Sequence, residues 1–308
     1  MDRRSCFSAE PPGRAPQRSQ IPTIVLATRN RRQRVLATLA RLEGLAERPR
    51  VVVVVDHAST DDTASAIGER FPDVTVIASP RHIGSAARTL GVEAAETPLV
   101  AFSDDDSWWE AGALRRAADV FQAYPQLGLI AARILVEPEG RLDPTCNAMR
   151  DSPLRSDTPL PGPPILGFLA CGAVARRSAV LACGGFHARY GFGGEEHLLA
   201  VDMAAAGWGL AYVEDVVAHH EPESGPRNWI GTHELRNRLW STWLRRPLAR
   251  AARLTIALTV DGDGHGVPAF VAAMRGLPWV LRERRVIPEE VERGLRLLES
   301  PSWSARWS

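Results

Sequence analysis

The chain has 308 residues, and its 37 basic residues, all of them arginine, face 36 acidic residues for a formal net charge of +1. This length supports one large domain, or a domain with an appendage, around a full hydrophobic core. A nucleic-acid-binding protein usually shows a strong basic excess, so the balanced charge argues against that class.

The sequence also lacks the marks of an exported or membrane-spanning protein. Its longest apolar runs are far shorter than the ~20 residues that span a bilayer. Residues 1–20 contain arginine and proline without an apolar signal segment, and we expect them to form a disordered tail. Scattered cysteines that match no zinc or redox spacing are typical of free thiols; they are Cys6, Cys146, Cys171 and Cys183. These features predict a cytoplasmic protein.

From residue 21 onward, short apolar runs alternate with amphipathic segments. Strands are expected at residues 23–27, 50–55, 74–78 and 98–102, and the helices that follow them at residues 31–45, 61–70, 84–95 and 110–123. This alternation is typical of βαβ units, in which helices cover a parallel sheet. The predicted fold class is therefore α/β, with a Rossmann-like, mostly parallel sheet and helices on both faces.

The pattern changes in the second part of the chain. Residues 138–164 are rich in proline and are expected to form a long loop, either functional or a plain insertion. An acidic helix start at residues 191–196 and a strand at residues 209–220 follow, and the chain then becomes arginine-rich and helical. We expect one domain over residues 21–225, which divides into halves at residues 21–107 and 108–225. A C-terminal helical extension is expected to follow at residues 226–308.

Polar residues cluster where each of the four strands ends. The clusters comprise Thr28 and Arg29 after the first strand, Asp56 and His57 after the second, Arg81 after the third, and Asp104, Asp105 and Asp106 after the fourth. Open α/β sheets bind ligands outside the carboxyl ends of their strands. At this edge, Asp56 suits hydrogen bonds from a nucleotide base or ribose, and Arg81 suits a diphosphate. Arg88 is either a second diphosphate contact or an exposed arginine on a helix.

The three adjacent aspartates raise the question of what compensates their charge. One interpretation is helix capping, because Asp106 or Ser107 precedes a predicted helix and either residue type is a good N-cap. The other is a divalent cation, since Mg²⁺ and Mn²⁺ bind one or two carboxylates together with substrate phosphates. Three carboxylates exceed what a cap needs, so the cation is the favoured interpretation.

Two further groups come later in the chain. Glu195 and Glu196 stand at a helix start, where they either compensate the helix dipole or provide a general base for an incoming hydroxyl. His219 and His220 end the strand at residues 209–220. This pair is either structural or supplies a ligand to a metal or a phosphate.

Seven motifs follow one another along the chain: TIVLATRNR, VVVDHASTDDT, GSAARTLGVEAA, VAFSDDDSWWEAGAL, CGAVARRSAVLACGGF, GGEEHLLAVDMAAAGW and VVAHH. In this order they resemble the family 2 glycosyltransferases, which have the nucleotide-diphospho-sugar transferase fold, or glycosyltransferase A fold. Each motif alone is weakly specific, but their order over residues 21–220 is strongly specific. The helical tail resembles the extension of many bacterial members and carries no motif of equal strength.

The resemblance implies roles for individual residues. Asp104 and Asp106 match the metal-binding Asp-x-Asp, and Asp105 matches a further ribose or metal contact. Glu196 matches the general base, within the acidic pair that it forms with Glu195. The remaining matches are Thr28 and Asp56 at base-binding positions and His219 as a ligand of the metal or diphosphate. Further candidates for contacts with the nucleotide sugar lie at or near the strand ends: Arg29, His57, Arg81 and Arg88.

The activity that the resemblance implies is metal-dependent, inverting transfer of a sugar from a nucleoside-diphosphate sugar to an acceptor hydroxyl, with Mn²⁺ or Mg²⁺ as cofactor. His57 and Glu196 both stand where the family commonly has aspartate. These departures motivate one alternative, a non-catalytic nucleotide-sugar-binding protein. A sugar nucleotidyltransferase is a weaker alternative, because the residues after the first strand lack the glycine-rich phosphate loop.

The resemblance does not select one acceptor, and it leaves contacts with a membrane or a second copy of the chain open. Acceptors of three kinds fit the resemblance: a glycan, a lipid-linked sugar or a small molecule. Trp229, Trp240 and Trp243 lie among arginines, a composition that favours a membrane surface. The C-terminal helices therefore either contact the inner face of the membrane peripherally or pack these tryptophans on the domain. A homodimer is a further hypothesis.

Overall fold

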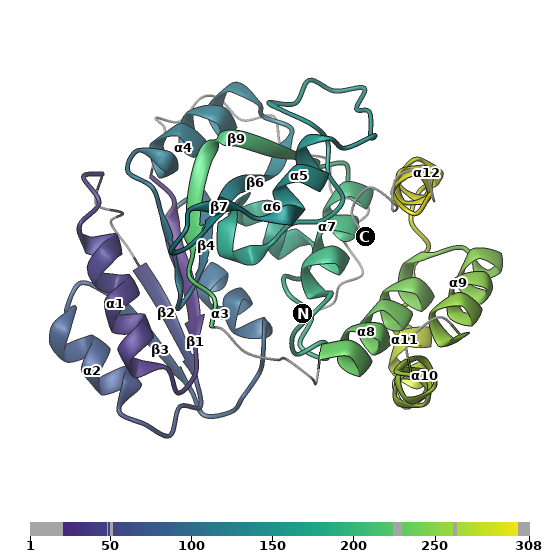
Figure 1. The fold of residues 1–308 in the computed structure, drawn as a ribbon, viewed down its shortest axis with the longest axis horizontal. Coiled ribbons are helices and arrows are strands. Elements are labelled where there is room, and N and C mark those ends of the chain that lie inside the picture. Colours follow the sequence, from purple (N-terminus) through teal and green to yellow (C-terminus); the bar gives the residue numbers. More distant parts are fainter. Residues whose placement is uncertain (1–20, 48, 50–51, 224–229, 261–263, 301–308) are drawn as a thin grey trace.

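A computed structural model describes residues 21–47, 49, 52–223, 230–260 and 264–300 (Figure 1). The tail predicted at residues 1–20 and Trp229 lie outside the described residues. In Figure 1 the sheet with its covering helices lies to the left, and the C-terminal helices lie together on the right.

The first four expected strands form a parallel half of the sheet. They are β1 (Thr23–Thr28), β2 (Val52–His57), β3 (Thr75–Ser79) and β4 (Leu99–Asp104), in the spatial order β3-β2-β1-β4. The helices between them are α1 (Arg32–Glu43), α2 (Thr63–Arg70) and α3 (Ala86–Ala94). Side chains alternate along a strand, so Ile24 and Leu26 share a core with α1 while Val25 faces the core shared with α3. The parallel strands and their helical cover are confirmed.

The second half of the sheet mixes parallel and antiparallel pairs. Its strands are β5 (Ser107–Trp109), β6 (Leu127–Val136), β7 (Arg141–Leu142), β8 (Ala173–Arg176) and β9 (Gly209–His220). The order continues β4-β8-β6-β9-β5, with β7 beside β6. β8 is antiparallel to β4 and β6, whereas β9 is parallel to β6 and antiparallel to β5. The α/β fold class is confirmed, and the sheet includes β6, which was not among the predicted strands.

The aspartate triplet does not cap a helix. Asp104 ends β4 and Ser107 begins β5, and α4 (Ala113–Ala123) starts only after Gly112. The helix predicted from residue 110 is therefore shorter, and the capping interpretation is wrong. Because β5 pairs with the end of β9, Ser107 lies opposite His220, and the triplet is brought beside that histidine.

The proline-rich stretch at residues 138–164 is not a loop throughout, so that expectation is partly wrong. It contains β7 and the helix α5 (Pro144–Arg150). Asp143 Oδ1 caps this helix by accepting a hydrogen bond from Thr145 N at 2.8 Å, and proline is favoured at the first helical position. A 3₁₀ turn (Ala170–Gly172) and the helices α6 (Arg177–Ala182) and α7 (Glu195–Ala205) follow.

The chain continues into the helices predicted for the extension. They are α8 (Ile230–Arg245), α9 (Leu248–Val260), α10 (Gly266–Met274), α11 (Leu277–Glu283) and α12 (Glu289–Leu298). Trp240 is buried against Trp279, and Trp243 donates its indole N–H to Thr255 Oγ1 at 2.8 Å, so both tryptophans pack within the protein. In the described part of the chain, no helix combines the length and apolar composition needed to cross a bilayer.

Two buried ion pairs fasten the C-terminal helices. Arg245 of α8 forms a bidentate pair with Asp202 of α7, in which Nη2 lies 2.9 Å from Oδ2. Beside it, Arg246 pairs with Glu292 of α12. Asp202 is 3% exposed and Glu292 is fully buried, so water cannot replace a lost guanidinium at either carboxylate.

Replacing Arg245 with methionine is expected to lower the free energy of unfolding by about 3–5 kcal/mol, because it removes the bidentate guanidinium partner of the buried Asp202 carboxylate. Urea unfolding measures the change. Arg282→Met, which removes an exposed arginine of α11, is the matched control and should stay within about 0.5 kcal/mol of the unsubstituted protein. Equal stability of both variants would contradict the role of this ion pair.

Candidate active site

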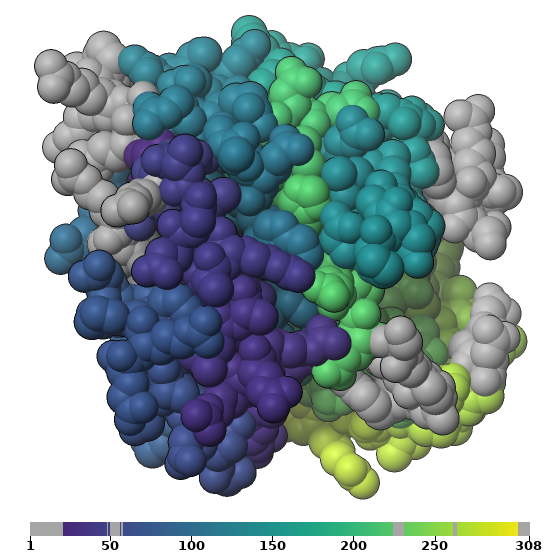
Figure 2. Space-filling view, turned by 60° about the vertical axis from the view of Figure 1, so that its left-hand side comes forward, coloured from purple at the N-terminus to yellow at the C-terminus, as the bar shows by residue number. Residues whose placement is uncertain are grey.

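The carboxyl ends of neighbouring strands bring the predicted polar residues to one edge of the sheet. In the register of the sheet, Thr28 pairs with Asp56, and Ala27 pairs with Asp104. The end of β9 joins them from the other half. Figure 2 shows the green atoms of this segment against the purple atoms of the N-terminal part of the domain.

Guanidinium groups compensate the charge of the aspartate triplet. Asp105 Oδ1 lies 3.2 Å from Arg31 Nε. Asp106 Oδ2 lies 3.3 Å from both Arg31 Nη2 and Arg34 Nη1. Both arginines come from the start of α1, directly after the end of β1. The start of α1 therefore supplies positive charge to two of the three crowded carboxylates, and Asp104 pairs with Arg88 instead.

The two buried aspartates of the triplet, Asp105 and Asp106, differ in their pKa. Burial raises the pKa of Asp105 to about 6, although the charge of Arg31 and the Thr28 hydroxyl, which donates to Oδ2 at 2.7 Å, favour the ionised form. Burial acts in the same direction on Asp106, but the hydrogen bond and charge of His220, with the nearby arginines, lower the pKa of Asp106 below its usual value. Asp106 is therefore the firmly ionised member of this pair.

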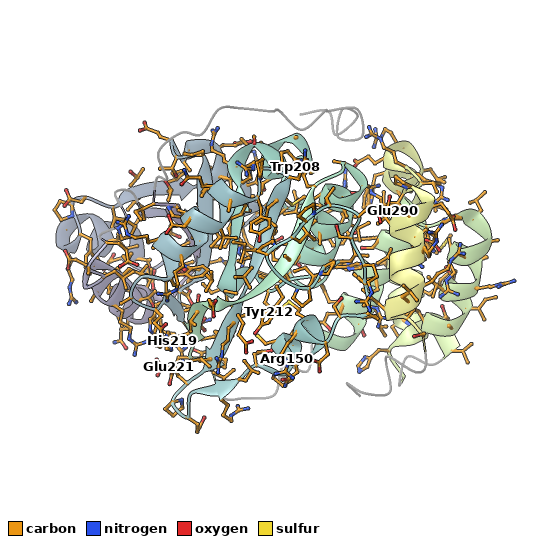
Figure 3. All side chains as sticks on the ribbon, turned by 90° about the horizontal axis from the view of Figure 1, so that it is seen from above. Arg150, Trp208, Tyr212, His219, Glu221 and Glu290 are labelled. Carbon is orange, nitrogen blue, oxygen red and sulfur yellow. The ribbon has the colours of Figure 1, made fainter. Side chains whose placement is uncertain are left out.

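Of the two histidines that end β9, His220 faces the triplet. Its Nε2 lies 3.4 Å from Asp106 Oδ1, and although burial opposes the imidazolium, this carboxylate raises the pKa of His220. His219 Nδ1 lies 2.7 Å from Glu137 Oε1, and its ring stacks on Trp108. Figure 3 shows His219 near Glu221 at the end of β9. Successive side chains of a strand point to opposite faces, so His220 takes the place at the triplet that was expected for His219.

Arg88 links the aspartates to helix α7. Its guanidinium is buried, with Nη2 paired to Asp104 Oδ1 and Nη1 3.8 Å from Glu195 Oε1. Burial disfavours the charged guanidinium, but the carboxylates of Asp104, Glu196 and Glu195 outweigh it and raise the pKa of Arg88. One permanent positive charge therefore holds carboxylates from both halves of the chain.

A close glycine contact sets the distance between α3 and the loop before α7. Ser85 N donates a hydrogen bond to Gly191 O at 2.8 Å, and Gly84 has a φ of +58°. A Cβ atom at residue 84 would lie 2.7 Å from Gly191 Cα, closer than side-chain atoms normally come. Because Arg88 lies about one helical turn further along α3, this approach brings its guanidinium to Glu195.

Several polar atoms around Arg88 are buried without a hydrogen-bond partner among the described residues. They include Arg88 Nε and Nη1, Glu195 Oε2 and Ser85 Oγ. Buried polar groups in native proteins are nearly always paired. These atoms therefore have unused capacity to bind a polar ligand such as a phosphate or a sugar.

Glu196 is held beside this group by a backbone contact. Its Oε1 accepts a hydrogen bond from Ala170 N at 2.7 Å. Burial and the charge of Glu195 raise the pKa of Glu196 to about 8, although Arg88 and the Ala170 hydrogen bond favour the ionised form. A carboxylate whose pKa lies near the working pH is suited to accept a proton during a reaction.

A hollow of about 270 Å³ lies at the ends of β2 and β3, and Asp56, Ser59, Asp61 and Ser79 are among the residues that line it. Asp56 is 4% exposed, and its Oδ1 accepts a hydrogen bond from Ser59 N at 3.1 Å. This hollow is the place at the sheet edge where a planar base or a ribose would meet the predicted contact Asp56.

The other residues expected around the nucleotide lie near this hollow or beneath it. Arg29 is exposed, with its Nε 3.4 Å from Ala58 O, and Arg81 is exposed just after β3. Thr28 is buried, and its hydroxyl binds Asp105. His57 ends β2, and its side chain lies outside the described part of the structure.

The donor set at the triplet fits a divalent cation only if a substrate completes the coordination. Asp104 and Asp106 offer carboxylate oxygens, which suit Mn²⁺, and His220 offers an imidazole nitrogen once it is in the neutral form. Among the described residues, no three acidic, histidine or cysteine side chains form a ready metal cage. Mg²⁺-type sites commonly use one or two carboxylates plus substrate phosphates, and the residues present match that arrangement.

Sequence reasoning missed Arg31 and Arg34 as members of the site. A signal was available, because residues three apart share one face of a helix and this helix follows the first strand end directly. For the histidine pair the sequence carried no such signal. Only the register of β9 against β5 decides which histidine faces the aspartates.

Comparison with known proteins identifies the family. The model of "Glycosyl transferase family 2" matches residues 23–184. A curated relative is N-acetylglucosaminyl-diphospho-decaprenol L-rhamnosyltransferase of Mycobacterium tuberculosis. It is 26% identical, and the match covers 71% of this chain and 85% of the relative.

Solved structures share the fold at low identity. The mannosyltransferase PcManGT from Pyrobaculum calidifontis, in complex with GDP-Man and Mn²⁺, has a TM-score of 0.57 at 18% identity, over 97% of this chain and 86% of that chain. S. aureus TarS 1–349 in complex with UDP-GlcNAc has a TM-score of 0.61 at 16% identity, over 88% of this chain and 82% of that chain. The fold is the glycosyltransferase A fold. The chain belongs to glycosyl transferase family 2 and is a glycosyltransferase.

Proposed function

We propose that this chain is a divalent-cation-dependent, inverting glycosyltransferase that moves a sugar from a nucleoside-diphosphate sugar to a hydroxyl of a lipid-linked acceptor. The observation that carries the proposal is the contact chain from Asp104 through Arg88 to Glu195, next to Glu196. It joins the strand ends, where family members bind a nucleotide sugar, to the carboxylate suited to activate an acceptor.

On the donor side, the hollow at Asp56 would receive the base or ribose. Arg88 Nε and Nη1, which have no hydrogen-bond partner among the described residues, would bind diphosphate oxygens. Asp104, Asp106 and His220 would hold the cation together with the diphosphate. When bound, the cation supplies positive charge beside the departing nucleoside diphosphate.

On the acceptor side, Glu196 takes the proton of the acceptor hydroxyl as its oxygen bonds to the anomeric carbon. The bond from that carbon to the diphosphate oxygen breaks in the same displacement, so the configuration inverts. The Ala170 N–H fixes the orientation of the Glu196 carboxylate. Arg88 favours the ionised form that acts as the base.

The acceptor class rests on the curated relative, whose name describes rhamnosyl transfer to a sugar on a polyprenyl diphosphate. We carry over the class of acceptor and leave the donor sugar open. The solved neighbours were obtained with different nucleotide sugars, GDP-Man and UDP-GlcNAc, so fold similarity does not select one donor.

Replacing Glu196 with glutamine is expected to lower kcat by about 10²–10⁴-fold, because the amide cannot take the acceptor proton. Donor affinity should change little, since the variant keeps the shape of the side chain. Release of nucleoside diphosphate in the presence of acceptor measures kcat, and calorimetry with the donor measures affinity. Glu290→Gln, at an exposed carboxylate of α12, is the control.

Near-normal transfer by Glu196→Gln would remove this residue from the base role. Donor binding by the unsubstituted protein without transfer or hydrolysis would instead support the non-catalytic alternative.

The pH dependence of transfer should follow the ionisation of Glu196. Its pKa is raised to about 8, and only the ionised form accepts a proton, so kcat/KM is expected to rise with pH below about 8 and to level off above it. Initial rates at low substrate concentration between about pH 6 and pH 9.5 give the profile. A rate that is flat or falls across this range would contradict the assignment.

A further inference from the structure

A second cavity, of about 510 Å³, lies between α7 and the C-terminal helices. Its volume is within the range of ligand pockets, which hold roughly 300–1,000 Å³. The wall has an apolar side and a polar side. The apolar side comes from α7, α9, α12 and the loop after residue 165, and includes Leu166, Leu198, Val201, Leu254, Leu258 and Leu295. The polar side comes mainly from α8 and includes hydroxyl groups, arginines and Glu234, with Glu299 after α12. An isoprenoid or acyl chain would bury its apolar surface against the leucines and the valine of this apolar side.

Three arginines also line this cavity, and they are not equivalent. Arg245 and Arg246 are engaged by buried carboxylates, as the ion pairs with Asp202 and Glu292 show. Arg238 of α8 is exposed and forms no ion pair among the described residues, not even with Glu234 one turn earlier. A free guanidinium beside an apolar wall is suited to an anionic headgroup that carries an apolar chain.

The cavity adjoins helix α7, which carries the candidate base Glu196. Gly194 and His197, which flank the Glu195–Glu196 pair, line it. The loop that supplies Leu166 and Gly167 to the wall also supplies Ala170, whose N–H binds Glu196. A ligand in the cavity is therefore separated from Glu196 only by the first turn of α7 and this loop.

The outer face of the same helices is apolar and exposed. Helix α9 turns Leu254 and Leu258 toward the cavity, while Leu248, Ile256 and Val260 are 76%, 66% and 75% exposed. On α10, Val267, Val271 and Met274 form a second exposed stripe. These stripes lie outside the cavity, since none of their residues lines it.

We propose that this cavity binds the polyprenyl diphosphate part of a lipid-linked acceptor, with the first isoprene units against the leucines of α9 and α12 and the diphosphate at Arg238. The inference rests on the proposed function for the acceptor class and adds where the lipid is held. The sugar attached to the diphosphate would then extend past the first turn of α7 toward Glu196.

The test uses farnesyl diphosphate as a short, water-soluble polyprenyl diphosphate, titrated into the full chain without any nucleotide. Arg238→Ala removes the free guanidinium, and Leu258→Trp fills the apolar wall. The matched controls are Arg253→Ala and Ile256→Trp, which change an exposed arginine and an exposed apolar residue of α9 outside the cavity. Nucleotide binding by the same preparations confirms that each variant keeps its strand-end site.

The expected result is saturable binding that weakens about tenfold or more in each cavity variant and stays within about twofold of normal in each control. Inorganic diphosphate and farnesol should each bind far more weakly, because each offers one half of the ligand. Absence of saturable binding, or equal affinity in all variants, would overturn the proposal. If inorganic diphosphate binds as tightly as farnesyl diphosphate, the cavity is only an anion site. If farnesol binds as tightly and Arg238→Ala has no effect, the cavity is only a nonspecific apolar pocket. Either result would also overturn the proposal.

These outcomes separate the inference from the proposed function. Sugar transfer to an acceptor without farnesyl diphosphate binding would overturn the cavity assignment alone. Farnesyl diphosphate binding at the cavity, with no transfer from any nucleotide sugar, would overturn the proposed function and leave the cavity assignment standing.

Discussion

The charge of Arg88 is the interaction on which the site depends. A guanidinium that is 5% exposed stays ionised here because three carboxylates surround it, and those carboxylates tolerate burial because the guanidinium is there. Asp104 comes from the end of β4 and Glu195 from the start of α7, two elements far apart in the sequence. Their shared partner fixes the distance between the strand ends and the candidate base, and the contact between Gly84 and Gly191 allows α3 to come close enough.

Arginines also compensate the buried carboxylates of the aspartate triplet, but they come from the start of α1 rather than from α3. Arg31 and Arg34 pair with Asp105 and Asp106, and they also pair with Glu223 beyond the end of β9. The first helix of the domain is thereby tied electrostatically to its last strand. A cation and a diphosphate would meet a preorganised set of charges, so little rearrangement of the protein would be needed on binding.

Much of this architecture could be predicted from the sequence, and the exceptions have physical causes. Alternating apolar runs identified the parallel strands, and their ends located Asp56 and the triplet, because strand direction alone brings these ends together. The choice between His219 and His220 depends on the pairing of β9 with β5, a long-range register that no local pattern encodes. The cavity beside α7 arises from the packing of five segments, and only the tertiary structure brings Arg238 to its wall.

We propose that the triplet binds a nucleoside diphosphate through a cation. Calorimetric titration of UDP, GDP and dTDP, with and without Mn²⁺, tests it on the unsubstituted chain and on Asp106→Asn, His220→Ala and the control His219→Ala. We expect Mn²⁺-dependent binding of one of the nucleotides, lost in Asp106→Asn, weakened in His220→Ala and retained in His219→Ala. No nucleotide binding, or binding that is indifferent to both Mn²⁺ and Asp106, would contradict it and leave the arginines as the only compensation for the triplet.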